Sequence, residues 1–333
     1  MKINAVFEGG GVKAIGLVGA LQAAQEKGIQ FERVAGTSSG SMVASMLAAG
    51  YTPEEMRDII ASTPFTSFIK KGPLHQIRII GPAVRLFIKK GLYSGEALER
   101  WMAHKLAAKG VRTFADLKPG TLKIVASDIS QGKLLVLPDD IEQYGWKPAQ
   151  LSVARAVRMS TSIPYFFDPV ILRKPFQKQK PQLPFAQQFV YVVDGGLLSN
   201  FPLWLFDREE SPKVSSVVPT LGFQLVGISD SRQHQIRGPL SMLTALFSTM
   251  MEAHDQRYIE QHNVFRTIKI PTLGVRVTDF DISPEKSMAL YDSGLEAGRQ
   301  YFSSWTVGHY VQEMNKVRRM QSAAAAQQQA EKK

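Results

Sequence analysis

The chain has 333 residues, of which 44% are hydrophobic, and this is enough apolar material for a substantial buried core. The absence of cysteine excludes disulfides, thiolate catalysis and any zinc site that needs cysteine. A formal net charge of +11 predicts attraction to polyanions, either nucleic acid or an anionic membrane surface. Because neither a zinc-finger spacing nor an RNP-type motif accompanies this charge, we expect no nucleic-acid partner.

The first residues predict a strand that leads through a glycine loop into a helix. The apolar run "INAVF" is followed by Glu8, by Gly9–Gly11 and then by a helix-like run that ends at Lys27 and Gly28. Glu8 interrupts the apolar stretch too early for a secretory signal, so we expect a cytoplasmic protein without a transmembrane span. Three consecutive glycines before a helix expose backbone N–H groups where negative charge is favoured, which predicts an anion-binding loop.

The same loop has a second interpretation. Gly9, Gly11 and Ala14 fit the pattern G-x-G-x-x-A of dinucleotide-binding proteins, and Glu32 follows at about the distance of the acid that binds a ribose. A nucleotide-binding oxidoreductase that uses Gly9 to Ala14 is therefore an alternative at this point. A purely structural glycine turn is a third possibility.

The next strand-like run, Phe31–Val34, leads into "GTSSG" and then into a strong helix former from Met42 to Ala49. The motif has G-x-S-x-G spacing with Ser38 at its centre, which predicts a strand-to-helix turn that presents the serine hydroxyl. Gly36 and Gly40 would let this turn close without steric collision. Together, an anion-binding loop and a serine turn at successive strand ends supply a nucleophile and oxyanion donors, which acyl transfer requires.

A third helix is predicted to begin at Thr52 and Pro53, with Glu55 completing a capping box. The following segment, from Ile59 to Gly95, has no acidic residue and interleaves cations with large apolar side chains. This basic, apolar insertion, about residues 63–95, is typical of a segment that lies on a membrane surface, although a helical hairpin packed on the core fits equally well. Its cations are Lys70, Lys71, Arg78, Arg85, Lys89 and Lys90.

Two later runs, Leu122–Ser127 and Phe189–Asp194, are almost continuously apolar. This pattern indicates strands buried on both faces of a mainly parallel sheet, and the alternation with helices favours a layered α/β fold. Between a helix and the second run, Arg173–Gln188 is rich in proline, lysine and glutamine and predicts a surface excursion. The low-complexity tail Ser322–Lys333 predicts a frayed helix end or disorder.

A serine nucleophile needs a base, and none of the six histidines follows a predicted strand beside an acid. Asp194 does end a buried strand, and Gly195 and Gly196 follow it. An aspartate in this place could turn toward the edge where open α/β sheets form their sites. Taken alone, the motif is more simply an ordinary Asp-Gly turn.

Three stretches, "EGGGVKAIG", "GTSSG" and "DGG", resemble the patatin-like phospholipase family. In that family a glycine-rich oxyanion loop, a G-x-S-x-G nucleophile and a DGG or DGA aspartate occur in this order, and a Ser-Asp dyad acts without histidine. The blocks "RMSTSIPYFFDPV" and "GLYSGEALERWM" also look like parts of the family, and the resemblance runs clearly from Ile3 to Leu205. It implies a three-layer α/β/α sandwich with a central, mainly parallel sheet.

The resemblance also implies an activity. It points to a serine-dependent lipid acyl hydrolase of the phospholipase A or lysophospholipase type, with a phospholipid or another acyl-ester lipid as substrate. It implies no metal and no other cofactor. A peripheral membrane surface is the expected partner. A catalytically silent lipid-binding or regulatory protein of the same fold is the alternative.

Roles for single residues follow from the same resemblance. Ser38 would be the nucleophile, and Asp194 would be the general base. The implied oxyanion hole consists of backbone amides in the glycine loop with support from one cation, at Gly9, Gly10, Gly11 and Lys13.

Two consequences accompany these roles. Many members carry glycine where this chain has Ala14, so we expect the first turn of the helix to sit slightly differently. Asp194 must accept the serine proton, so we expect its carboxyl group to be desolvated with a raised pKa. We expect one domain over residues 3–310, with core motifs in residues 3–205, followed by a helix end and tail over residues 311–333.

Overall fold

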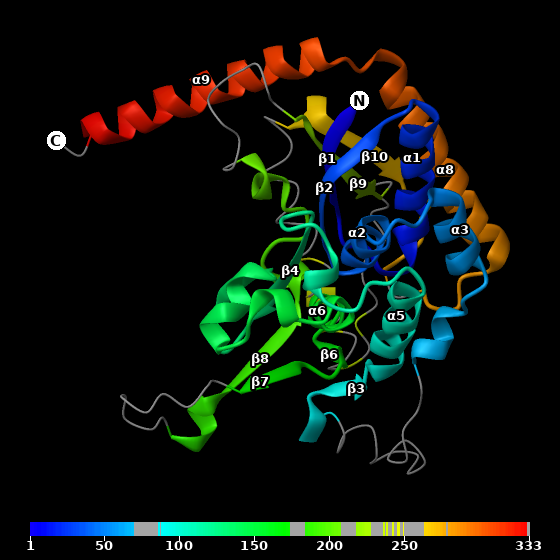
Figure 1. Cartoon of the computed structure of the whole chain (residues 1–333), viewed down its shortest axis with the longest axis vertical. Coiled ribbons are helices and arrows are strands. Elements are labelled where there is room, and N and C mark those ends of the chain that lie inside the picture. The colour runs from blue at the N-terminus through cyan, green and yellow to red at the C-terminus, as the bar shows by residue number, and fades with distance from the viewer. Residues whose placement is uncertain are drawn as a thin grey trace.

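The computed structural model places a central β-sheet between helices, with a long C-terminal helix that extends beyond the rest of the fold (Figure 1). It describes residues 1–69, 86, 88–173, 184–207, 218–227, 236, 238, 242, 245–246, 249, 263–277 and 279–331. The strands are β1 Lys2–Phe7, β2 Gln30–Thr37, β3 Gly91–Tyr93, β4 Leu122–Asp128, β5 Lys133–Leu137, β6 Tyr165–Phe167, β7 Val170–Arg173, β8 Phe189–Asp194, β9 Thr220–Val226 and β10 Thr267–Pro271. The α-helices are α1 Ala14–Glu26, α2 Ser39–Ala48, α3 Pro53–Ala61, α5 Glu96–Ala108, α6 Val153–Ser160, α8 Pro284–Ser304 and α9 Val307–Glu331.

The main sheet has the strand order β10-β9-β1-β2-β4-β8-β7, and β5 pairs with β4 as well. The first five strands in this order, from β10 to β4, are parallel to one another. The pairs that β4 forms with β5 and β8, and the pair of β7 with β8, are antiparallel. The predicted mainly parallel sheet is therefore present, and it carries an antiparallel edge that the sequence did not indicate.

The direction of β8 determines how the site is assembled. β2 and β4 run parallel with Thr37 opposite Val125, so Ser38 follows one residue beyond this pair. β8 runs antiparallel to β4 and ends with Asp194 opposite Ala126. An apolar run predicts burial on both faces but not strand direction, which depends on the connection to the preceding strand. Ser38 and Asp194 thus reach the same level of the sheet on the two sides of β4.

The sheet has covering layers on both faces, in agreement with the predicted three-layer α/β fold. Helices α1, α2 and α6 pack on one face, and α8 lies against α1 (Figure 1). The two helices are so close that a side chain at Gly294 on α8 would collide with the backbone of Gly16 on α1. On the other face, residues around the short 3₁₀ turn Leu203–Leu205 pack on Val6, Ala35 and Val125.

The local expectations for the helices agree with the structure. α3 begins with the predicted capping box, in which Glu55 N donates to Thr52 Oγ1 at 3.2 Å and Thr52 N donates to Glu55 Oε2 at 2.9 Å. The tail predicted as a frayed helix end belongs to α9, which continues to Glu331. The predicted excursion Arg173–Gln188 begins at the last residue of β7 rather than after a helix, because two short strands follow α6.

Much of the basic, apolar insertion lies outside the described residues, including Lys70, Lys71, Arg78 and Arg85. Lys89 and Lys90 are described, and Lys90 Nζ lies 5.0 Å from the ring centroid of Tyr191 on β8. Residues 174–183 of the excursion also lie outside the described part. Among the residues that the structure describes, no helix combines the length and apolar character needed to cross a membrane.

Candidate active site

Ser38 occupies the sharp turn between β2 and α2. Its backbone has φ 52° and ψ −128°, a region that is costly for any residue with a side chain and is often found at functional sites. A side chain at Gly36 would collide with the carbonyl group of Gly40, and one at Gly40 would collide with the carbonyl oxygens of Phe7 and Glu8. The strand-to-helix turn that the G-x-S-x-G spacing predicts is therefore possible only because both flanking positions are glycine.

The turn brings Ser38 to a buried carboxylate. Ser38 Oγ donates a hydrogen bond to Asp194 Oδ2 at 2.6 Å, and Asp194 Oδ1 accepts one from Gly196 N at 2.8 Å. Ser38 is 4% exposed and Asp194 is fully buried. Desolvation raises the pKa of Asp194 to about 7, although the two hydrogen bonds oppose this rise. A carboxyl group with this pKa can take up and return a proton near neutral pH, which is what a base for Ser38 must do.

The end of α6 holds the backbone on both sides of this hydrogen bond. Ser160 Oγ accepts a hydrogen bond from Ser38 N at 2.9 Å and donates one to Val125 O at 2.6 Å. Ser162 O accepts one from Asp194 N at 2.9 Å. A segment of three residues thus fixes the positions of Ser38 and Asp194 relative to each other. The sequence showed this segment only as the family block "RMSTS", without a role for its serines.

Arg158 in turn anchors this segment to the adjoining strands. Its guanidinium donates to Ser162 Oγ, to Ser94 O at 2.7 Å and to Asp168 O at 2.6 Å. Burial lowers the pKa of Arg158 to about 10. A side chain at Gly95 would collide with the guanidinium, which explains the glycine in "GLYSG". The blocks "RMSTSIPYFFDPV" and "GLYSGEALERWM" are therefore in contact through Arg158, next to the segment that binds the Asp194 amide.

The glycine loop follows β1 and lies beside the Ser38 turn. Gly9 N donates to Asn200 O and Asn200 Nδ2 donates to Gly9 O, both at 3.2 Å. Gly10 N donates to Ser39 Oγ at 3.0 Å. Gly11, which has φ 57°, makes no amide hydrogen bond with any described residue. Two of the three amides expected in the oxyanion hole thus already have partners, while the Gly11 amide has none within the described chain.

The residues after the loop begin the first helix. Lys13 ends a 3₁₀ turn, Gly11–Lys13, and its Cε lies 3.4 Å from the place that a Cβ on Gly10 would take. α1 begins directly after this turn, at Ala14, which is 5% exposed. The lysine side chain therefore lies beside the glycine loop, where a cation favours bound negative charge.

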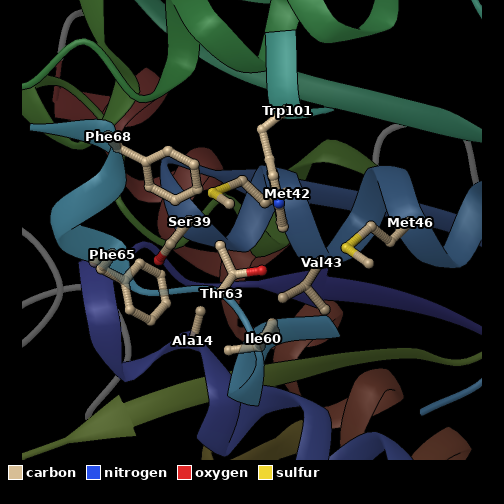
Figure 2. A pocket seen from close by; sticks show the side chains of 11 residues that line it. Ala14, Ser39, Met42, Val43, Met46, Ile60, Thr63, Phe65, Phe68 and Trp101 are labelled. Carbon is tan, nitrogen blue, oxygen red and sulfur yellow. The ribbon is translucent and has the colours of Figure 1, made fainter. Parts of the chain in front are cut away.

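An apolar pocket opens next to this loop (Figure 2). Gly11, Ala14 and Ser39 form the part of its wall that belongs to the site. The ring centroids of Phe68 and Trp101 lie 5.4 Å apart on another side of the pocket. The remaining lining residues are Met42, Val43, Met46, Ile60, Thr63 and Phe65. The lining makes the pocket apolar, so it favours hydrocarbon over a polar group.

The structure does not support the dinucleotide interpretation. Ile3 on β1 is opposite Phe31 on β2, so Glu32 lies at the amino end of these parallel strands, whereas the glycine loop lies at their carboxyl end. Glu32 Oε2 instead pairs with Lys2 Nζ at 3.6 Å. Because a ribose-binding acid must stand near the phosphate loop, Glu32 cannot serve as one.

Neither histidine nor a metal cluster adjoins Ser38 in the described part of the chain. His104 on α5 and His309 on α9 are exposed there, and the other four histidines lie outside it. No group of three or more metal-binding side chains occurs among the described residues. Asp194 is thus the carboxylate within hydrogen-bond distance of Ser38 Oγ.

The raised pKa of Asp194 predicts a specific pH dependence of stability. Between about 4 and about 7 the folded protein keeps a proton that the unfolded chain has lost, so its free energy of unfolding should fall as the pH rises. Asp194→Asn cannot ionise and should lack this contribution. Urea unfolding across this range should show the two proteins diverging by a few kcal/mol, on the order set by the shift. A constant difference between them would mean an ordinary pKa for Asp194.

Comparison with known proteins was consistent with this geometry. The family model for "Patatin-like phospholipase" matches residues 5–207. "Uncharacterized protein YqhO" of Bacillus subtilis (strain 168) is 39% identical over 311 residues, covering 92% of this chain and 100% of the relative. "Probable lipid hydrolase 463L" of Invertebrate iridescent virus 6 is 26% identical over 209 residues, covering 60% of this chain and 61% of the viral protein.

Among solved structures, VipD from Legionella pneumophila is similar with a TM-score of 0.52 and 18% identity, covering 91% of this chain and 67% of VipD. This likeness concerns the fold. The family model covers more than half of the chain, and its matched range contains the glycine loop, the Ser38 turn and Asp194. The chain therefore belongs to the patatin-like phospholipase family.

Proposed function

We propose that this protein is a serine-dependent lipid acyl hydrolase of the phospholipase A or lysophospholipase type. The observation that carries the proposal is the buried 2.6 Å hydrogen bond from Ser38 Oγ to Asp194 Oδ2, at a strained turn beside an apolar pocket. Family membership and the viral relative named as a probable lipid hydrolase support a lipid ester as substrate. The proposed catalytic unit is residues 3–310, although α9 continues across this boundary from Val307 to Glu331 and Met314 still packs in the core.

The first half of the proposed reaction forms an acyl-enzyme. Ser38 Oγ attacks the carbonyl carbon of the ester while its proton passes to Asp194 Oδ2, and a tetrahedral intermediate forms. When this intermediate collapses, the bond to the alcohol oxygen breaks. The leaving alkoxide takes the proton from Asp194, so the carboxylate is regenerated. A pKa of about 7 suits a group that must accept and then donate this proton.

The second half releases the fatty acid. Water attacks the acyl carbon, and its proton passes to Asp194 Oδ2. The second tetrahedral intermediate expels Ser38 Oγ, which recovers the proton. Neither half requires a metal or an organic cofactor, because the attacking, basic and leaving groups are all supplied by the two side chains, the ester and water.

The negative oxygen of each intermediate needs preorganised donors. We propose the Gly11 amide together with the amide of Ser39, the residue directly after the nucleophile, because neither is hydrogen-bonded within the described chain and both residues line the pocket. Gly9 and Gly10 then shape the loop through their bonds to Asn200 and Ser39. Lys13, beside Gly10, adds positive charge to the loop.

A peripheral membrane surface is the proposed place of substrate binding. The support is the cationic and apolar composition of the insertion, together with Ile88, which is 59% exposed beside Lys89 and Lys90. The positive net charge of the chain favours an anionic surface for this contact.

Covalent labelling tests the proposed nucleophile. A long-chain fluorophosphonate reacts with serines that are activated beside donors for an oxyanion, so intact mass should show one adduct on the unaltered protein. Ser38→Ala should show none, and Asp194→Asn should label far more slowly because no base takes the proton. Failure of the unaltered protein to label, even with lipid vesicles present, would favour the catalytically silent lipid-binding protein.

Ser160 provides a test of how the site is held. Ser160→Ala removes the acceptor for the Ser38 amide, and we expect the labelling rate to fall between about tenfold and a hundredfold through displacement of Ser38. The matched control is Ser45→Ala, which removes an equally buried hydroxyl that bonds Ser41 O within α2. Equal labelling rates in the two variants would show that Ser160 has no positioning role.

A further inference from the structure

The antiparallel end of the sheet has one face that is turned away from the main core. Alternate side chains of β7 and β8 are buried in that core: Val170, Leu172, Val190 and Val192. The side chains between them point to the opposite face of the sheet: Ile171, Arg173, Phe189 and Tyr191. An antiparallel sheet that packs one face on the core normally carries polar side chains on the other. Here the second face is largely aliphatic and aromatic.

The strand register joins these side chains into one patch. Tyr191 lies between Ile171 on the neighbouring strand and Ile129, whose amide donates to Tyr191 O at 3.0 Å. Both isoleucine side chains are 50% exposed. Phe189 packs on Phe185 with ring centroids 5.1 Å apart, and Phe185 is 73% exposed. Together these residues form a contiguous exposed patch, here named the outer face, and such a patch is typical of an interaction site.

The charges beside the outer face are positive. Lys90 Nζ lies 5.0 Å from the ring centroid of Tyr191, so the basic insertion reaches this face. Arg173 lies opposite Phe189 and donates to Gln188 Oε1 at 3.3 Å, a neutral amide that leaves the charge in place. The sequence from residue 169 to residue 193 has no acidic residue, and its cations are Arg173, Lys174, Lys178 and Lys180. Two acid-free segments of the chain thus meet at Lys90 and Tyr191.

We propose that the outer face, with Lys90 and Arg173 at its edge, docks the protein on an anionic phospholipid bilayer. This deepens the proposed function, on which it rests for the substrate surface, by assigning membrane contact to β7 and β8 in addition to the insertion. Figure 1 shows β3, β7 and β8 at the end of the molecule opposite α9. Asp194 follows Tyr191 by three residues on β8, about 10 Å along the strand, so docking here holds the site close to the lipid.

The chemistry of the outer face favours a bilayer over other partners. Isoleucine side chains neither stack on nucleic-acid bases nor donate hydrogen bonds, but they bury readily in hydrocarbon. Tyrosine and the long cationic side chains extend polar groups toward the headgroups. A second copy of the chain would bring cations against cations, whereas an anionic surface attracts them.

Co-sedimentation with vesicles tests the docking face. The unaltered protein should bind vesicles of equal parts phosphatidylglycerol and phosphatidylcholine, and should bind pure phosphatidylcholine far more weakly. Ile171→Glu combined with Arg173→Glu, the outer-face variant, should lower the partition coefficient for the anionic vesicles by about tenfold or more, because apolar contact and charge attraction are both lost. The matched control is Met320→Glu combined with Arg319→Glu on α9, where Met320 is 58% exposed and the net charge changes equally. Lys90→Glu, outside the strands, replaces the outer-face variant if that protein does not fold, and should also weaken binding.

Hydrolysis of the soluble ester p-nitrophenyl butanoate separates docking from chemistry. In the outer-face variant, hydrolysis of phospholipid in anionic vesicles should fall in step with binding, whereas hydrolysis of the soluble ester should fall much less. If the unaltered protein hydrolyses no ester but vesicle binding behaves as stated, the proposed function fails and the docking face stands. The docking face is overturned if the unaltered protein binds no vesicles or binds neutral ones equally well, or if the outer-face and α9 variants bind alike. A dimer in sedimentation equilibrium that only the outer-face variant dissociates would also overturn it, in favour of a second copy of the chain.

Discussion

The structure depends on one buried contact, the hydrogen bond between Ser38 and a carboxyl group that has been removed from water. Burial of Asp194 destabilises its charged form, and the hydrogen bonds from Ser38 and Gly196 compensate only in part. This imbalance gives the carboxyl group a pKa near neutrality, which an exposed aspartate does not have. It also explains how a serine can be activated here although no described histidine contacts it. The surrounding hydrogen bonds keep the two side chains together despite the cost of burial.

The contact requires unusually close approach of several backbone segments. Gly36, Gly40 and Gly195 each stand where a side chain would collide with a neighbouring carbonyl group, so β2, α2, β1 and β4 can converge around Ser38. The hydroxyl of Ser160 links this turn to β4, and the carbonyl of Ser162 holds Asp194. On the side of the sheet the site is thus held by hydrogen bonds, whereas its other side adjoins the apolar pocket along α2.

Local sequence signals predicted much of this arrangement. Apolar runs gave β4 and β8 almost to the residue, and the glycine-flanked serine gave the turn at Ser38, because these features depend on neighbours in the chain. The antiparallel direction of β8 was not predictable, because an apolar run indicates that a strand is buried but not in which direction it runs. The roles of Ser160, Ser162 and Asn200 were also missed, because their partners lie far away in sequence. The pocket is a third such feature, as it joins α2, α3 and α5 with the turn at Phe65–Phe68.

The most direct test of the central claim is the pH dependence of the rate at which a fluorophosphonate labels Ser38. If Asp194 is the base, the rate should rise with pH through a single titration near 7, the pKa that burial gives this carboxyl group. The titration should be absent from the residual labelling of Asp194→Asn. A rate that does not change between pH 5 and pH 8, or a titration that persists in Asp194→Asn, would contradict the account.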